Sequence, residues 1–175
     1  MKTIRPGLLL FFVQLVLVLS VAGKYLYERQ TRPRVWTKAT QFDPNLPLRG
    51  RYLALQLLLD ACSLPQDAEH VIRPYSGSHS FWQWNVSLAA ENGKIVPRVA
   101  PQGRETLTLF ADRPCDRAAL SNQELLFIPD RARVPLPLQP GQELWVEVTV
   151  PASGPPRPIQ IALSSAAGFH PVKLE

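Results

Sequence analysis

Hydrophobic residues follow two different patterns along the chain, and the change between them divides it in two. From Leu8 to Ala22 every residue is apolar except Gln14 and Ser20. Beyond this run, apolar and polar residues alternate over short stretches, which is the period of a β-strand with one buried face. The sequence therefore predicts an N-terminal anchor and tether over residues 1–30 and a β-rich domain over residues 31–175.

The apolar run is long enough to cross a membrane. Extended over residues 7–27 it holds about 21 residues, and at about 1.5 Å per residue this matches a hydrocarbon core about 30 Å thick. The run ends with Lys24, Tyr25 and Tyr27, which are residue types that favour the membrane interface. We expect residues 7–27 to contact the lipid bilayer as an uncleaved, single-pass anchor.

Two other interpretations of this run stay open. Ser20-Val21-Ala22 has the small-x-small form that a signal peptidase accepts, so cleavage after Ala22 would release a soluble, exported binding protein. The other interpretation is a buried core helix, although little of the remaining sequence predicts helices that could cover it.

The orientation of the anchor is a separate question. Positive charge after the run exceeds the charge before it, which opposes an N-inside orientation. The two cysteines and the strand-rich, proline-rich domain instead suit an exported compartment.

The rest of the chain predicts about eight strands. Between residues 51 and 59 both faces are largely apolar, with Leu53, Leu55, Leu57 and Leu59 on one of them, so we expect this strand to be central. Helical turns are expected only near 66–71 and 118–120. The predicted strands are 34–40, 51–59, 81–90, a run from 95, 104–111, 123–128, 143–150 and 159–163.

Turn signals join these strands into hairpins. Asn92-Gly93 lies between two apolar runs, and an Asn-Gly pair accepts the positive φ angles of a tight hairpin. A Gly- and Pro-rich turn at 151–158 predicts a second hairpin. Trp82 and Trp84 share one strand face, which predicts core positions, with a binding surface as the alternative. Consecutive short strands without intervening helices predict a mainly β fold, an antiparallel barrel or sandwich.

Composition supports this interpretation. The chain has 175 residues, of which 46% are hydrophobic and 19% are charged, as in folded proteins. Its eighteen prolines favour strands joined by stiff loops over long helices. The net charge of +5 is spread along the chain without a basic helix or a nucleic-acid-binding motif. We therefore expect no nucleic-acid partner.

The segment that leads into the predicted central strand carries a short motif. An Asp-Pro pair is followed by Arg-Gly and then by Tyr-x-x-Leu. The stretch resembles the GDYXXLXY family of bacterial membrane-anchored proteins, which is named for Gly-Asp-Tyr-x-x-Leu-x-Tyr. The matching residues are Asp43, Pro44, Arg49, Gly50, Tyr52 and Leu55. Arg51 stands where the family has its Asp, and Leu57 stands where it has its last Tyr.

The resemblance extends over nearly the whole chain after residue 24. It implies an N-terminal membrane helix that bears a β-rich domain of unknown biochemistry. It also implies an accessory or interaction module for an integral membrane protein, with a multi-pass membrane protein as the partner. Arg51 replaces a carboxylate by a cation, which puts in question any family role that needs that carboxylate, such as metal ligation.

The candidate chemistry is sparse. Cys62 and Cys115 predict one disulfide in an oxidising compartment, and such a loop of about 50 residues would stabilise the fold by up to roughly 4 kcal/mol. Two buried thiols are the alternative. His70, His79 and His170 are scattered without the spacing of metal ligands.

We expect no catalytic, metal or cofactor site. A weaker hypothesis is a thiol-dependent or hydrolytic enzyme that uses the long connection between residues 60 and 80, with Cys62 and His70 or His79 as the reacting groups.

Overall fold

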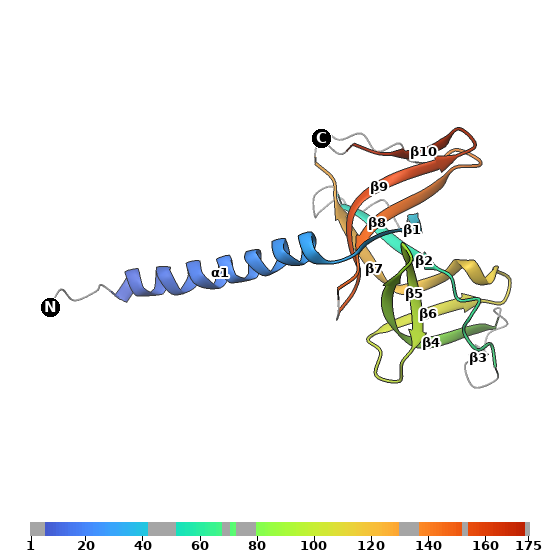
Figure 1. Cartoon of the computed structure of the whole chain (residues 1–175), viewed down its shortest axis with the longest axis horizontal. Helices are drawn as coiled ribbons and strands as arrows, with labels where there is room; N and C mark the ends of the chain where they lie inside the picture. The colour runs from blue at the N-terminus through green and yellow to red at the C-terminus, as the bar shows by residue number, and fades with distance from the viewer. Residues whose placement is uncertain are drawn as a thin grey trace. The chain divides into compact units, whose positions relative to one another are not determined.

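The computed structural model describes residues 6–41, 52–67, 71–72, 80–129, 137–151 and 154–173. The chain divides into two units, Met1–Arg32 and Pro33–Glu175, and each is described by itself (Figure 1). The first unit contains one helix, α1, and the second contains the strands. The boundary lies two residues beyond the one predicted from the sequence.

Helix α1 spans Pro6–Thr31. Proline suits the first position of a helix because the amide hydrogen that it lacks would have no partner there, and Pro33 lies just past the last turn. The stretch Gly7–Glu28 has a mean hydropathy of 2.1 and none of it is buried, so by length and composition it could cross a membrane or serve as a signal sequence. Thr31 Oγ1 donates a hydrogen bond of 2.8 Å to the carbonyl oxygen of Tyr27 in the last turn.

The described residues of the second unit form one antiparallel sheet of ten strands in the order β10-β9-β8-β1-β2-β7-β6-β4-β3, with β5 paired to β4. Figure 1 shows β8, β9 and β10 at one end of the domain and β3, β4 and β6 at the other. The strands are β1 Arg34–Gln41, β2 Tyr52–Leu59, β3 Val71–Ile72, β4 Phe81–Glu91, β5 Lys94–Val99, β6 Glu105–Phe110, β7 Ala118–Phe127, β8 Glu143–Thr149, β9 Arg157–Ser165 and β10 Gly168–Pro171; one 3₁₀ turn, η1, covers Cys115–Arg117.

The sheet folds over on itself around a single core. Strand β5 contacts β1 and β2, and β7 contacts β9, although these strands are not neighbours in the sheet. The terminal strands of the order are not hydrogen-bonded to each other within the described ranges, so the sheet is not closed. The prediction of a mainly β, antiparallel fold with one N-terminal apolar helix is confirmed.

Strand β2 is the centre of this sheet, as its sequence predicts. It pairs with β1 on one edge and β7 on the other. Leu55 and Leu57 are fully buried, and on the opposite face Ala54 and Leu58 are also buried. A strand covered on both faces needs apolar residues at consecutive positions, which explains why the alternation is weak here.

The hairpin at Asn92-Gly93 is also confirmed. Strand β4 pairs with β5 through Glu91 and Lys94, and the two residues between them have φ angles of 51° and 74°. Both angles lie in the left-handed region that Asn and Gly tolerate best. The predicted hairpin around 151–158 forms between β8 and β9.

Both predicted helical turns differ from the structure. Ala118, Ala119 and Leu120 belong to β7, where Ala118 and Ala119 pair with Leu59 and Leu58 of β2. The turn lies three residues earlier, at η1, since pairing with the central strand outweighs the helix propensity of alanine. Val71 begins strand β3, so the expected helix does not reach it, and residues 68–70 lie outside the described part of the chain.

Candidate functional site

The residues of the motif fall into two groups. Asp43, Pro44, Arg49, Gly50 and Arg51 lie outside the described residues. Tyr52 and Leu55, both in β2, point to opposite faces of the strand. Tyr52 is 44% exposed and its ring lies 5.5 Å from that of Phe127, whereas Leu55 is fully buried. Leu55 therefore has a core position, and Tyr52 presents its ring on the surface.

The two cysteines are joined. Cys62, just after β2, and Cys115, in η1, form a disulfide with their Cα atoms 4.8 Å apart. The amide of Ala61 also donates a 2.9 Å hydrogen bond to the carbonyl oxygen of Cys115. The disulfide therefore holds the exit of the central strand against the turn that begins β7.

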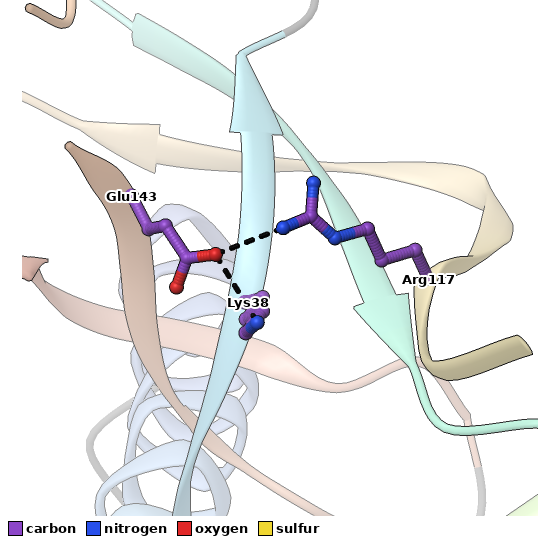
Figure 2. Close-up of polar contacts among 3 residues, drawn as sticks. All are labelled: Lys38, Arg117 and Glu143. Carbon is purple, nitrogen blue, oxygen red and sulfur yellow. Dashed lines mark hydrogen bonds and ion pairs between the residues drawn. The ribbon is translucent and has the colours of Figure 1, made fainter. Parts of the chain in front are cut away.

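A cluster of three charged side chains lies next to this turn (Figure 2). Glu143 Oε1, on β8, accepts hydrogen bonds from Lys38 Nζ on β1 at 3.1 Å and from Arg117 Nη2 in η1 at 3.0 Å. All three side chains are partly exposed, so water and salt weaken these ion pairs. The cluster connects three elements, and the two cations leave it with a net charge of +1.

Aromatic rings continue the same face of the sheet. Trp36 of β1 and Trp145 of β8 both meet Phe169 of β10 edge to face, at centroid distances of 5.0 and 6.1 Å. Lys38 Nζ lies 5.8 Å from the centre of the Trp145 ring, a cation–π contact. The rings cover β1 and β8 on the side opposite the core. Trp145 is half-buried, and its Nε1 has no hydrogen-bond partner among the residues that the structure describes.

Two carboxylates point towards the interior instead. Glu105 of β6 is 4% exposed and Glu124 of β7 is 9% exposed. Asn122 Nδ2 donates a 2.6 Å hydrogen bond to Glu105 Oε2. Burial, reinforced by the nearby Glu105 carboxylate and opposed by the Arg157 guanidinium, raises the pKa of Glu124 to about 7. Near neutral pH, Glu124 therefore exists in both protonation states.

A cavity of about 230 Å³ opens beside Glu105. Gly103, in the lining of the cavity, packs closely against the backbone of Val86. A Cβ at position 103 would lie 2.6 Å from the Val86 carbonyl oxygen, so only glycine fits there without displacing the backbone. The described residues that line the cavity are Val86, Ser87, Leu88, Gln102, Gly103, Arg104, Glu105, Pro151 and Gly154.

Glu105 lines the cavity, and its hydrogen-bond partner is the side chain of Asn122. Within the described residues, no hydrogen bond joins Glu105 to a hydroxyl or thiol group that could act as a nucleophile. The described residues contain no group of three or more His, Cys, Asp or Glu side chains that could hold a metal ion. Both cysteines are in the disulfide, so neither is available as the nucleophile of the thiol-dependent hypothesis.

Of the three histidines, the described part of the chain includes His170. His70 and His79 lie outside the described residues, and His170 is exposed on the edge strand β10. Trp84 is 1% exposed and Trp82 packs against the core, as the core interpretation of these tryptophans expects. Trp84 Nε1 donates a 2.9 Å hydrogen bond to the carbonyl oxygen of Pro65.

The two interior carboxylates, Glu105 and Glu124, were not predicted from the sequence. Glu124 has the same strand parity as Leu126 and Ile128, which are buried. A charged residue at an inward position of an alternating strand is a signal that could have identified it. Glu105 gave a weaker signal, because it is the first residue of its strand.

No family model, no curated protein and no solved structure matches this chain. The resemblance to the GDYXXLXY family therefore stays a prediction from the motif.

Proposed function

We propose that this protein is a membrane-anchored β-domain that acts as an accessory or interaction module for an integral membrane protein of the bacterial cell envelope. In this proposal α1 spans the inner membrane once and the β-domain lies on the periplasmic side. The domain acts by binding and not by catalysis. The family resemblance suggests a multi-pass membrane protein as the partner.

The observation that carries the proposal is the apolar surface of α1. From Leu8 to Tyr27 its large hydrophobic side chains are 40–67% exposed. Exposing such a continuous apolar surface to water is unfavourable, whereas in a bilayer the same side chains contact apolar lipid tails. The β-domain has its own core, built without residues of α1.

The disulfide supports the choice of compartment. Disulfides persist in the bacterial periplasm and are rare in the reducing cytosol. Cys62 and Cys115 are the only cysteines of the chain, and both are used. A domain that depends on this bond is better suited to the periplasmic side.

Membrane fractionation tests the anchor directly. We expect the full-length protein to stay in the membrane after alkaline carbonate extraction. We also expect added protease to degrade the β-domain in spheroplasts but not in intact cells. A carbonate-soluble protein, or a domain protected in spheroplasts, would contradict the proposal.

The second candidate function, an exported soluble binding protein, rests on the Ser20-Val21-Ala22 sequence. It predicts a periplasmic form that begins at Gly23, which intact-mass measurement identifies. If cleavage after Ala22 occurs, an Ala22→Phe variant should keep the full mass while the wild type loses residues 1–22, since a large side chain there blocks signal peptidase. An unchanged full-length mass in both proteins favours the anchor.

The partner is tested in intact membranes. Photo-crosslinking from Tyr52, which the structure leaves exposed, followed by mass spectrometry should identify an integral membrane protein. Crosslinking from buried Leu55 of the same strand is the matched negative control. Recovery of soluble proteins alone would argue against the accessory role.

A further inference from the structure

Gln14 differs from every other residue in the middle of α1. It is one of two polar side chains between Leu8 and Ala22. The other, Ser20, donates its hydroxyl hydrogen to the carbonyl oxygen of Leu17 at 2.8 Å and so is satisfied within the helix. The Gln14 carboxamide is exposed and makes no hydrogen bond within the described part of the chain.

The depth of Gln14 matters if α1 crosses a membrane. Seven residues separate it from Gly7, the first residue of the apolar stretch, which is about 10 Å along a helix. Fourteen residues, about 21 Å, separate it from Glu28. A glutamine side chain is too short to reach either polar interface, so its carboxamide has no access to water from within the hydrocarbon core.

An unpaired carboxamide is costly in hydrocarbon, because its two donors and its acceptor lose the hydrogen bonds that water provides. A neighbouring helix removes that cost when it offers a polar group at the same depth. Hydrogen bonds between Gln, Asn, Ser or Thr side chains are a common way in which membrane helices associate. The exposed, unsatisfied Gln14 therefore indicates a helix partner.

The surface around Gln14 suits close helix packing. Gly7, Gln14 and Val21 recur at intervals of seven residues and follow one stripe of the helix. Phe11 and Val18 lie on the same side, at three or four residues from Gln14. Gly7 has open space where a Cβ would stand, so a second backbone can approach there.

We propose that α1 is a self-association surface: two copies of this chain pair in the membrane through this stripe, with their Gln14 carboxamides hydrogen-bonded to each other. The partner is a second copy because a carboxamide is both donor and acceptor, and so is complementary to itself. In a parallel pair the two Gln14 residues also lie at the same depth. This inference rests on the proposed function, because it requires α1 to span a membrane.

The test uses the full chain in phosphatidylcholine vesicles, with donor or acceptor dye attached at the C-terminus. Energy transfer is measured as the protein-to-lipid ratio is raised. Gln14→Leu removes the carboxamide and keeps the helix apolar. Ser20→Ala is the matched control, because the Ser20 hydroxyl is satisfied within the helix, and Gln14→Asn restores a carboxamide.

We expect the wild-type chain to associate and Gln14→Leu to weaken association roughly tenfold. Ser20→Ala and Gln14→Asn should behave like the wild type. Association that Gln14→Leu leaves unchanged overturns the proposal. So does the absence of energy transfer from wild-type protein alone, which would point to a helix of another membrane protein as the partner.

Carbonate extraction of the same vesicles separates this inference from the proposed function. Protein that resists extraction but does not associate overturns self-association and leaves the anchor intact. Protein that is extracted overturns both.

Discussion

At the scale of single residues, Glu124 is a buried carboxyl group with a strongly raised pKa. A buried carboxylate is unfavourable when charged unless a cation or hydrogen-bond donors compensate it. Arg157 compensates Glu124 only in part, and the neighbouring Glu105 opposes it. The pKa of about 7 is the result, compared with an ordinary value of 4.5.

This raised pKa predicts that the domain loses stability as the pH rises. A carboxyl group that binds its proton more tightly in the folded state than in the unfolded state stabilises the fold fully below pH 4.5, and this contribution is lost as the pH rises through 7. The shift corresponds to at most about 3 kcal/mol. Urea denaturation at pH 5 and pH 8 should show the unfolding free energy falling by up to this amount.

Glu124→Gln should flatten that pH dependence and raise the stability at pH 8, because the amide needs no proton to be neutral. Glu147→Gln is the matched control, since Gln160 Nε2 can still donate to the amide oxygen at position 147. Equal pH dependence in the wild type and Glu124→Gln would show that another group is responsible.

At the scale of elements, the start of β7 is held by two kinds of contact with other strands. The disulfide holds η1 to the end of β2, and Arg117 extends from the same turn to Glu143 of β8. Lys38 adds β1 to the cluster. A covalent bond and an ion cluster thus act on one turn, and their contributions to stability should differ greatly.

Loss of the disulfide should be costly. Closing a loop with a sequence separation of 53 residues restricts the unfolded chain, and this is expected to contribute about 4 kcal/mol. Cys62→Ser with Cys115→Ser should therefore lower the unfolding free energy by about 2–4 kcal/mol. A reducing agent should destabilise the wild type and leave the double variant unchanged; a wild type insensitive to reduction would contradict this.

Loss of the ion cluster should cost little. The pairs are partly exposed, so Glu143→Gln should lower the unfolding free energy by less than about 1 kcal/mol. The difference in unfolding free energy between the wild type and Glu143→Gln should shrink further in roughly 0.5 M salt, because the salt screens charges beyond a few ångströms. A larger loss that salt does not reduce would show that Glu143 has another structural role.

At the scale of the whole molecule, the two units have different requirements for stability. The hydrophobic core formed by the described residues of the β-domain contains no residue of α1, and none of the apolar stretch of α1 is buried. The core of the β-domain is therefore built without the helix.

Residues 33–175 should consequently fold when produced alone under oxidising conditions. We expect a soluble protein with a β-type circular-dichroism spectrum and one cooperative unfolding transition. The full-length chain should need detergent or lipid to stay in solution. A mainly helical or unfolded spectrum for residues 33–175 would contradict the assignment of the two units.

Much of this fold could be predicted from local patterns, because each of the predicted features depends on one segment of the chain alone. The apolar run of α1, the parity of Leu55 and Leu57 in β2 and the Asn92-Gly93 turn are all visible in consecutive residues. Short elements could not be predicted in this way. Val71–Ile72 and Gly168–Pro171 are too short to show a period, and they form strands only because β4 and β9 offer them an edge.

The candidate sites depended on long-range pairing. The hydrophobic pattern of the chain was sufficient to specify an apolar N-terminal helix and a domain built from strands, because burial on one face imposes a repeat on neighbouring residues. This pattern contained no information on which strands distant in the sequence become neighbours. Only the fold decided that Glu105 and Glu124 approach each other on β6 and β7, and that Lys38, Arg117 and Glu143 meet from three elements. These contacts arise from the order of strands in the sheet, which is set by how the whole chain buries its core.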